Sequence, residues 1–505
     1  MNEGNQNFAA LVEATCQRHA SRPALFFDDR SLSYGELAAL AEGWAARLRA
    51  AGVAPGDCVA TWLPNCPTFV AVFLASLRTG AIAAPLGALL TAREVRARLT
   101  VARAGVLVTT PALAAQLGDV SAKVIAVDPR APSLEVAERR PPVARDATDL
   151  AVLVSTSGTT GDAKAAELTH GGITWNASAL AAGFAMEPGD VQLAVAPLSH
   201  VLGMAGVMNA SLLRGGALAL VERFDAPTVL ALMRERRITG VFGAPSMFLA
   251  LLREARRSAI APALRFAMAG GAALSPDLTS AFQQTFGCTL HDGYGMSEVG
   301  GGVTLTPPGT TPKARSVGPA FSGSELRVVD LVTGVPLPAG ARGEVAVRSP
   351  SVMRGYRDDD QATRAVLDPD GWLLTGDIGY LDEDGHLFLV DRKKELIIRS
   401  GYNVYPREVE EVLLSHPAVR EAAVVGVPHP DHGEEVIALV VPSHETIDTE
   451  GVKAFARERL AAYKYPRHVL VVAELAKGPT GKIAKRAIDV PQLLARCAME
   501  ERDRR

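Results

Sequence analysis

Two glycine-rich loops, each carrying a lysine, lie far apart in this chain of 505 residues. One reads Ser155-Thr156-Ser157-Gly158-Thr159-Thr160-Gly161-Asp162-Ala163-Lys164, and the other reads Lys477-Gly478-Pro479-Thr480-Gly481-Lys482. Backbone N–H groups, hydroxyls and an ammonium group are suited to cradling phosphates. The first loop is not a Walker loop, because no Gly-Lys-Ser/Thr sequence follows at the required spacing. The two loops together predict a phosphate-bearing substrate that one part of the chain holds and another closes over.

The first loop follows a region in which strands and helices alternate. Ser33 and Glu36 form a capping-box pattern, and apolar residues then recur at helical spacing, namely Leu37, Leu40, Ala41, Trp44 and Leu48. Strands expected at 59–63 and 81–85 flank a helix at 69–77. Such alternation predicts a parallel sheet with helices on both faces. A further buried strand at 149–154 places the loop at its carboxyl end, where α/β folds bind ligands.

The second loop belongs to a region of different texture, which begins near Gly343. An antiparallel strand is expected at 344–348, and a hairpin turn at 382–386 is expected before a strand at 387–390. After the charged run 391–395, we expect helices at 408–414 and 452–460 and strands at 419–425 and 436–441. The predicted fold class is α/β. A large N-terminal domain of parallel and mixed sheets with flanking helices covers residues 1–392, and a small mobile α+β C-terminal domain covers 393–505.

Composition and charge exclude several classes of function. A net charge of −3 without a basic stripe argues against a nucleic-acid partner. The cysteines, Cys16, Cys58, Cys66, Cys288 and Cys497, are too scattered for a disulfide framework or a metal site. Residues 191–213 carry no charged side chain, but the polar residues inside this stretch favour the wall of a buried pocket over a transmembrane segment. We expect a cytoplasmic protein; a peripheral membrane contact and a homodimer are left open.

Nine short motifs then occur in one order along the chain: Ser157-Gly158-Thr159-Thr160-Gly161, Pro197-Leu198-Ser199-His200, Gly270-Gly271-Ala272, Tyr294-Gly295-Met296-Ser297-Glu298, Gly343-Glu344, Thr375-Gly376-Asp377, Asp391-Arg392-Lys393-Lys394, Gly401-Tyr402-Asn403-Val404-Tyr405-Pro406 and Pro479-Thr480-Gly481-Lys482. In content and order they resemble the adenylate-forming superfamily of acyl-CoA synthetases, luciferases and nonribosomal adenylation domains. Each motif alone is weak, and the order of all nine makes the resemblance specific.

The resemblance implies a site for ATP, Mg²⁺ and CoA. Tyr294 would stack on adenine, Asp377 would accept hydrogen bonds from the ribose, and Glu298 with Thr160 would hold Mg²⁺. The full set implied for ATP or AMP is Ser157, Gly158, Thr159, Thr160, Gly161, Lys164, Gly271, Ala272, Ala273, Asp292, Gly293, Tyr294, Gly295, Met296, Ser297, Asp377 and Arg392. Lys482, His200, Glu298 and Thr160 are the implied catalytic residues, Lys394 the hinge, and Ser400, Gly401 and Tyr402 the CoA-binding residues.

Each of these residues also has an ordinary structural interpretation. Asp377 after a glycine is typical of a turn, Tyr294 of a core position, and Glu298 of a solvated carboxylate. His200 is typical of a buried histidine with a hydrogen-bonding partner, whereas the resemblance makes it a pocket gate. The run around Lys394 is typical of a solvated charged surface.

The first loop departs from the pattern of the superfamily. It usually ends in Pro-Lys-Gly, and here it reads Ala163-Lys164-Ala165. If residue 165 has to be left-handed, alanine there costs about 1–2 kcal/mol more than glycine. The substitution Ala165→Gly is therefore expected to leave the function of the loop unchanged or to improve it. Ser297 replaces a commoner threonine and keeps the hydroxyl group.

The implied reaction joins a small-molecule carboxylic acid to AMP and then to CoA. Amino-acid-activating members of the superfamily carry an aspartate shortly after the motif that ends at His200, so the absence of an acidic residue from 198–209 implies that an amino acid is not the substrate. The apolar residues at 205–208 and 241–247 favour an apolar acyl pocket. We favour a medium- or long-chain fatty acid, with an aryl or short branched acid as the alternative. A ligase that loads a carrier protein and a weakened adenylate-binding protein also remain. A P-loop NTPase would leave Lys482 unexplained.

Overall fold

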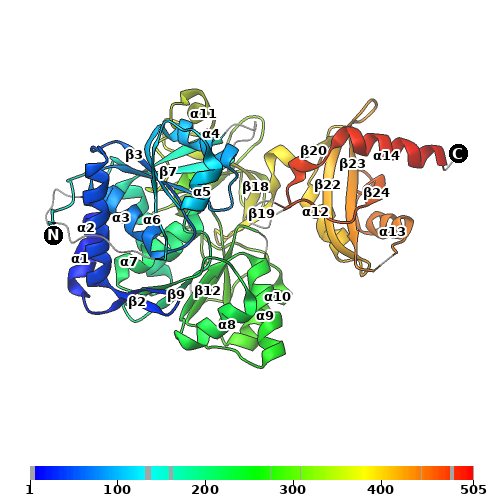
Figure 1. Ribbon diagram of the computed structural model, residues 1–505. Coiled ribbons are helices and arrows are strands. Elements are labelled where there is room, and N and C mark those ends of the chain that lie inside the picture. Colours follow the sequence, from blue (N-terminus) through cyan, green and yellow to red (C-terminus); the bar gives the residue numbers. More distant parts are fainter. Residues whose placement is uncertain are drawn as a thin grey trace. The chain divides into compact units, whose positions relative to one another are not determined.

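Strand–helix alternation in the first part of the chain produces two sheets in the computed structural model of the protein (Figure 1). The structure describes residues 6–130, 138–157, 163–272, 274–306, 309–444, 446–477 and 483–503. It divides into two units. Unit 1 comprises Met1–Leu326, Val347–Leu374 and Asp384–Leu387, and unit 2 comprises Arg327–Ala346, Thr375–Glu383 and Phe388–Arg505. The domain boundary expected at residue 392 stays a prediction.

The first sheet of unit 1 has six strands in the order β6-β5-β3-β4-β7-β8. Their bounds are β3 Cys58–Trp62, β4 Ile82–Leu86, β5 Ala104–Thr109, β6 Lys123–Ala126, β7 Leu150–Ser157 and β8 Ala163–Thr169. All neighbours are parallel except β7 and β8, which form an antiparallel pair. Helices α4 (Ala92–Ala102) and α5 (Pro111–Leu117) contribute apolar residues to the core on one face. The parallel sheet that the sequence predicts is confirmed, with one antiparallel edge strand.

The second sheet of unit 1 has seven strands in the order β13-β12-β11-β9-β10-β1-β2. Their bounds are β1 Pro23–Phe27, β2 Arg30–Ser33, β9 Val191–Ala194, β10 Ala217–Leu220, β11 Gly240–Gly243, β12 Phe266–Gly270 and β13 Leu290–Gly293. Only the pair β1 and β2 is antiparallel. Helices α8 (Ala226–Glu235), α9 (Pro245–Ser258) and α10 (Pro276–Phe286), green in Figure 1, pack on one face.

A layer of helices contacts both sheets of unit 1. It comprises α1 Phe8–Arg18, α2 Tyr34–Ala50, α3 Pro67–Arg78, α6 His170–Gly183, the π-helix η1 Leu202–Asn209 and α7 Ala210–Arg214. Helix α2 packs on α3 and contacts β1, while α3 contacts β3 and β4. The predicted capping box forms, because Ser33 Oγ accepts from Glu36 N at 3.2 Å and Glu36 Oε2 accepts from Ser33 N at 2.7 Å. The five apolar residues predicted for its inner face are all buried.

The uncharged stretch 191–213 becomes strand β9, a connecting turn, the π-helix η1 and most of α7. No helix within the described ranges is both long and apolar enough to cross a membrane. Cys16, Cys58, Cys66 and Cys288 are free and buried, and burial raises the pKa of Cys16 to about 11 and that of Cys58 to about 12. These four cysteines are therefore buried thiols that form no disulfide, which agrees with their scattered positions in the sequence.

The remaining short elements of the first 375 residues are β14 Gly295–Met296, the 3₁₀ turn η2 Ser297–Val299, β15 Gly301–Gly302 and α11 Asp360–Val366. A four-stranded sheet has the order β16-β17-β18-β19, with bounds β16 Glu325–Val329, β17 Gly343–Arg348, β18 Leu373–Leu381 and β19 Leu387–Arg392. The predicted turn at 382–386 lies between β18 and β19. The division between the two units passes through the strands of this sheet.

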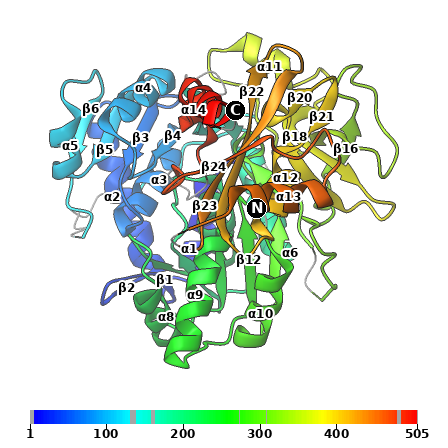
Figure 2. The same cartoon turned by 90° about the vertical axis from the view of Figure 1, so that its right-hand side faces the viewer.

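The C-terminal sheet of unit 2 has the order β21-β20-β23-β22, with β24 beside β23. The strands of this sheet are β20 Ile397–Arg399, β21 Tyr402–Val404, β22 Val419–His429, β23 Gly433–Pro442 and β24 His468–Val471. The helical elements of this part of the chain are η3 Lys393–Glu395, α12 Pro406–Leu414, α13 Thr449–Arg459, η4 Lys485–Ala487 and α14 Val490–Asp503. Alternation along β22 and β23 buries residues on both faces. Helices α12 and α13 pack on one face and α14 on the other, as Figure 2 shows.

Candidate active site

The first lysine loop is the tip of the antiparallel hairpin formed by β7 and β8. Thr156 pairs with Lys164 and Ser157 with Ala163. The strand therefore continues three residues beyond the predicted end at Val154, and Ser155 to Ser157 belong to the ladder and not to the loop. Gly158, Thr159, Thr160 and Gly161 lie outside the described residues, so their contact with a nucleotide stays a prediction. The hairpin fixes where the loop begins and ends.

Ala165 belongs to strand β8, where it pairs with Ser155. Its backbone is extended and its φ is not positive. The side chain is 2% exposed and lies in the core of the six-stranded sheet. The left-handed backbone that would make alanine costly at residue 165 is therefore absent, and a strand position favours a residue with a side chain over glycine. The departure from Pro-Lys-Gly changes the edge strand and leaves no strained residue there.

Glu298 is held from the chain segment 353–357. Its backbone carbonyl accepts from Met353 N at 2.7 Å, and its Oε1 accepts from the Tyr356 hydroxyl at 2.8 Å. The Lys164 ammonium lies 5.0 Å from the centre of the Tyr356 ring and 3.7 Å from Asp359 Oδ2. The structure therefore brings together Glu298, which the resemblance assigns to Mg²⁺, and Lys164, which it assigns to ATP, through a tyrosine that the sequence analysis missed.

The carboxyl ends of β12 and β13 carry the residues predicted for adenine. Gly270 pairs with Gly293, and Gly271 and Ala272 follow in exposed positions. Tyr294 is 8% exposed, and its backbone N–H donates to Thr304 Oγ1 at 3.1 Å. Ala273 lies outside the described residues. The glycines and Tyr294 thus occupy neighbouring strand ends, as the resemblance implies, and the stacking of Tyr294 on adenine stays a prediction.

Asn176 supports this edge from helix α6, and the sequence analysis did not identify it. Its amide nitrogen donates to Gly302 O at 2.7 Å and to Val299 O at 3.3 Å. Strand β15 in turn pairs with β14, where a Cβ on Gly295 would stand 2.0 Å from Gly301 O. Gly295 is therefore required by the close approach of two backbones. A buried asparagine on an apolar helix was the only sequence signal for this support.

His200 ends a turn whose preceding backbone is hydrogen-bonded to the side chain of Asn65. The Asn65 amide donates to Ala194 O at 2.9 Å and Ala196 O at 3.0 Å, and its Oδ1 accepts from Leu198 N at 2.9 Å. The His200 side chain is exposed, and its Nδ1 accepts from Leu202 N at 3.3 Å. His200 is thus not the buried histidine of the structural alternative, and its role as a gate stays a prediction.

The π-helix η1 begins at Leu202, two residues after His200, and forms an apolar wall. The Leu202 side chain approaches Gly270, and the Phe242 ring from β11 packs against Gly206. Ala205, Val207 and Met208 are each at most 1% exposed. Residues 202–209 contain no ionisable side chain. A π-helix is rare over more than one turn and is common at functional sites.

Unit 2 places two other predicted residues in contact. Arg392 Nε lies 3.0 Å from Asp377 Oδ1, and the side chain of Asp377 is buried. Glu344 supports the turn before Asp377, because its Oε1 accepts from Gly376 N at 3.1 Å and its Oε2 lies 2.6 Å from Lys393 Nζ. Lys394 lies in the 3₁₀ turn η3. The ribose-binding role of Asp377 and the hinge at Lys394 stay predictions.

Of the three predicted CoA-binding residues, Ser400 and Gly401 form the turn between β20 and β21, and Tyr402 begins β21. Ser400 and Gly401 have φ values of +51° and +80°. Ser400 N donates to His432 O at 2.8 Å, and Tyr402 stacks on Tyr463 with ring centres 4.7 Å apart. Tyr402 is 58% exposed. An exposed aromatic side chain on a fixed turn is suited to a ligand, so the geometry is compatible with the predicted role.

His429, His432 and Glu435 lie near this turn and are residue types that bind metals. Glu435 is already paired with the buried Arg399, whose Nε lies 2.9 Å from Glu435 Oε1. His429 Nδ1 accepts from Asp431 N at 3.2 Å, so in the neutral ring the proton is on Nε2. These contacts occupy Glu435 Oε1 and His429 Nδ1, and imidazoles are not the oxygen ligands that Mg²⁺ prefers. The predicted magnesium residues, Glu298 and Thr160, lie elsewhere in the chain.

The second lysine loop is closed at its base. Lys477 and Ile483 form an isolated antiparallel bridge, and Ala484 N donates to Ala476 O at 2.7 Å. Lys482 lies between these residues but outside the described part of the chain. The structure therefore fixes both ends of the loop, and the role of Lys482 stays a prediction.

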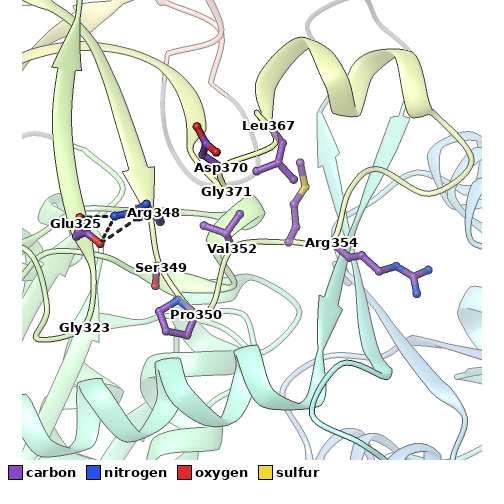
Figure 3. A pocket seen from close by; sticks show the side chains of 11 residues that line it. Gly323, Glu325, Arg348, Ser349, Pro350, Val352, Arg354, Leu367, Asp370 and Gly371 are labelled. Atoms are coloured by element: carbon purple, nitrogen blue, oxygen red, sulfur yellow. Dashed lines mark hydrogen bonds and ion pairs between the residues drawn. The ribbon is translucent and has the colours of Figure 1, made fainter. Parts of the chain in front are cut away.

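A hollow of about 560 Å³ lies in unit 1 and contains none of the predicted site residues. Its lining residues are Gly323, Glu325, Arg348, Ser349, Pro350, Val352, Met353, Arg354, Leu367, Asp370 and Gly371. Figure 3 shows Glu325 paired with Arg348 on one side, and Arg354 directed away from the hollow. Arg348 is thus already neutralised, and we assign no substrate to this hollow.

Comparison with known proteins places the chain in a family. The family model described as AMP-binding enzyme matches residues 12–357, and that of the AMP-binding enzyme C-terminal domain matches residues 408–482. A feruloyl-CoA synthase from Amycolatopsis is 38% identical over 461 residues, which cover 90% of this chain and 93% of the relative. A long-chain-fatty-acid–CoA ligase from Bacillus subtilis is 31% identical over 96% of this chain and 94% of the relative.

A solved structure agrees with this relationship. The o-succinylbenzoate CoA synthetase MenE from Bacillus subtilis, in complex with ATP and a magnesium ion, superposes with a TM-score of 0.86. It is 28% identical, and the match covers 95% of this chain and 98% of that chain. The sheets, the ordered motifs and these matches agree: the chain belongs to the AMP-binding enzyme family, and within this adenylate-forming superfamily it is an AMP-forming acid–CoA ligase.

Proposed function

We propose that this CoA ligase activates an apolar monocarboxylic acid, and that an aryl or arylalkenoic acid is its first candidate substrate. The observation that carries the proposal is the uncharged wall formed by η1, with Leu202 near Gly270 and Phe242 against Gly206. Burying an unpaired ammonium or a second carboxylate against such a wall costs several kcal/mol. An apolar acid avoids that cost, whereas an amino acid or a dicarboxylate does not.

The relatives support two acyl classes. The feruloyl-CoA synthase supports an aromatic acid, and the Bacillus long-chain-fatty-acid–CoA ligase supports the fatty acid that the sequence favoured. We place the aromatic acid first because that relative is the more similar of the two. The medium- or long-chain fatty acid is the second candidate.

The first half-reaction forms an acyl-adenylate and pyrophosphate. In the proposed arrangement, Tyr294 offers an aromatic face to adenine, and Gly271 and Ala272 allow the ring to approach. Asp377 accepts hydrogen bonds from the ribose hydroxyls, and Arg392 supports the same sugar or the α-phosphate. Lys482 offsets the negative charge that grows in the transition state between the carboxylate and the α-phosphate.

Magnesium fits the residues around Glu298. Mg²⁺ prefers oxygen ligands. The Glu298 carboxylate is half-buried, its Oε1 accepts from Tyr356, and its Oε2 makes no hydrogen bond to another described residue. One oxygen is therefore open to a cation, and Thr160 is the second proposed ligand. When bound, Mg²⁺ supplies positive charge to the phosphates, and the MenE structure with ATP and magnesium supports its presence.

The second half-reaction transfers the acyl group to CoA. We propose that the C-terminal part of the chain turns about Lys394, which withdraws Lys482 and brings the turn at Ser400 and Gly401 to the acyl-adenylate. The CoA thiolate then attacks the acyl carbonyl carbon, and AMP leaves. One site thus serves two reactions through two faces of one mobile part.

The substrate is tested by pyrophosphate release with ferulate, benzoate, octanoate, palmitate, malonate and phenylalanine. We expect ferulate or benzoate to react fastest, and malonate and phenylalanine to be slower by at least about 100-fold. A fatty acid in first place would replace the aromatic assignment and keep the apolar pocket. Malonate or phenylalanine in first place would overturn the pocket assignment. Parallel reactions with CoA and with an acyl carrier protein identify the acceptor.

A further inference from the structure

The segment 353–357 lies along strand β8 like an additional strand. Glu167 N donates to Gly355 O at 2.9 Å, and Arg354 N donates to Glu167 O at 2.8 Å. Arg357 N donates to Ala165 O at 2.8 Å, and Tyr356 forms a bridge with Ala166. These backbone bonds fix Tyr356 relative to the hairpin that carries the phosphate loop.

The same segment holds Glu298 at two points. Met353 N donates to the Glu298 backbone carbonyl at 2.7 Å, and the Tyr356 hydroxyl donates to Glu298 Oε1 at 2.8 Å. One contact fixes the backbone and the other fixes the rotation of the carboxylate. Tyr356 N also donates to Thr363 Oγ1 at 2.9 Å, which anchors the tyrosine itself. The orientation of the Glu298 carboxylate therefore depends on Tyr356.

The positively charged side chains that the structure describes around Tyr356 do not form an ion pair with Glu298, so its negative charge can act on a cation. Arg354 and Arg357 lie on the same segment, but their guanidinium groups pair with Glu167 at 2.9 Å and 3.1 Å. The Lys164 ammonium lies over the Tyr356 ring and near Asp359, with no ion pair to Glu298. Burial and the Glu298 charge raise the pKa of Tyr356, so the phenol stays protonated and can donate. A neutral donor thus orients the carboxylate without neutralising it.

We propose that Tyr356 is a positioning residue that presents Glu298 to the divalent cation and couples its orientation to the phosphate-loop hairpin. The proposal rests on the proposed role of Glu298 in holding Mg²⁺. Partners of metal-binding carboxylates typically change metal affinity by about 10- to 100-fold when removed. The Tyr356 ring also lies under Lys164, so only the hydroxyl group should be removed in the test.

The test measures Mn²⁺ binding by electron paramagnetic resonance, with a non-hydrolysable ATP analogue present at saturation. We expect Tyr356→Phe to weaken Mn²⁺ binding by about 10-fold or more. We also expect the pyrophosphate-forming rate to recover towards wild type at high Mg²⁺, because orientation and not the ligand has been lost. A merely structural defect would not be rescued by magnesium.

Tyr34→Phe is the matched control. It also removes a phenolic hydroxyl with a buried hydrogen bond, here to Gly216 O at 2.6 Å, but in helix α2. It should lower the melting temperature and leave Mn²⁺ affinity unchanged. Circular dichroism and melting curves verify that each variant is folded.

Glu298→Gln distinguishes the proposed metal-binding role of Glu298 from the proposed positioning role of Tyr356. If Glu298→Gln binds Mn²⁺ as tightly as wild type, the proposed metal role of Glu298 fails. If Glu298→Gln loses Mn²⁺ binding while Tyr356→Phe keeps wild-type affinity, the role of Tyr356 is overturned and that of Glu298 stands. Loss in both variants, with magnesium rescue only in Tyr356→Phe, is the expected result.

Discussion

At the scale of single residues, several buried side chains hold the backbone at the edges of the site. Asn65 satisfies two carbonyls and one N–H around Leu198, and Asn176 satisfies carbonyls of Val299 and Gly302. Buried backbone groups that leave a strand ladder need such partners. The positions of His200 and Gly295 therefore depend on side chains from other segments of the chain.

Ala165→Gly should destabilise the protein by about 1–2 kcal/mol. Glycine in a strand costs about 0.5–1 kcal/mol relative to alanine, and the lost buried methyl group adds about 0.8 kcal/mol. Urea unfolding measures the change. Ala126→Gly is the control, because Ala126 is an exposed strand residue and loses only the backbone contribution. A stability equal to wild type, together with tighter ATP binding, would restore the earlier expectation for this loop.

At the scale of elements, the π-helix η1 depends on a close approach to the turn before it. A Cβ on Gly203 would stand 2.3 Å from Pro197 O. His200 N also donates to Pro197 O at 2.9 Å, and Met204 N donates to His200 O at 2.8 Å. The helix and the His200 turn are therefore one packed unit, and a change in one moves the other.

Gly203→Ala should destabilise the protein by about 1–3 kcal/mol, the usual cost of overpacking, and should raise the KM for the carboxylic acid. The added methyl group meets a backbone oxygen, which cannot rotate away. Gly105→Ala is the control, since Gly105 lies in strand β5, has no neighbour within 4 Å of an added Cβ and does not have a positive φ. Equal unfolding curves for both variants would contradict the close packing of η1.

A hydrogen bond from the first residue of α1 to His170, the first residue of α6, connects these two helices, and protonation of His170 opposes folding. His170 is fully buried, and its Nδ1 accepts from Phe8 N at 3.2 Å. Burial, together with the nearby Arg145, lowers the pKa of His170 to about 4, although Asp149 acts in the opposite direction. The unfolded chain therefore binds a proton at a higher pH than the folded chain does.

The contribution of His170 to stability should be complete above about pH 6.5 and should be lost as the pH falls from there through about 4. The pKa difference corresponds to a loss of about 3 kcal/mol. Urea unfolding between pH 4 and 7.5 measures it. In His170→Asn this part of the pH dependence should disappear, whereas His444→Asn, at an exposed position, should keep it. Parallel pH profiles for wild type and His170→Asn would refute the assignment.

At the scale of the whole molecule, the proposed chemistry requires two units that work in turn. The residues proposed for adenine, together with Glu298, belong to unit 1, whereas Asp377, Arg392, the turn at Ser400 and the loop of Lys482 belong to unit 2. A reaction that uses different parts of unit 2 in its two steps should respond differently in each step when one part is altered.

Lys482→Ala should slow acyl-adenylate formation by about 100- to 1,000-fold, the usual effect of removing one transition-state donor. Thioester formation from supplied acyl-adenylate should fall far less, because Lys482 is then withdrawn. Rapid-quench measurements of each half-reaction test this. Lys477→Ala is a control at the base of the same loop, where the ammonium pairs with Glu421. Equal losses in both half-reactions for Lys482→Ala would contradict the swinging mechanism.

Local patterns in the sequence were sufficient for the family and for most of the elements. The capping box at Ser33, the helix after it and the strands β22 and β23 form as predicted, because hydrogen bonds and apolar spacing within one segment decide them. The order of nine motifs identified the adenylate-forming superfamily. The sequence favoured a fatty acid, whereas the relatives support an aromatic acid as well, because no short pattern records the shape of the acyl pocket.

Only the tertiary structure decided how distant segments meet. Ala165 looked like a loop residue until its pairing with Ser155 placed it in an edge strand. Glu298 and Tyr356 lie far apart in the chain, and nothing near either residue indicates their hydrogen bond. The packing of Gly203 on Pro197 likewise follows from a π-helix that apolar residues alone do not predict. Contacts of this kind depend on the three-dimensional path of the backbone, and sequence periodicity records only the face that each segment buries.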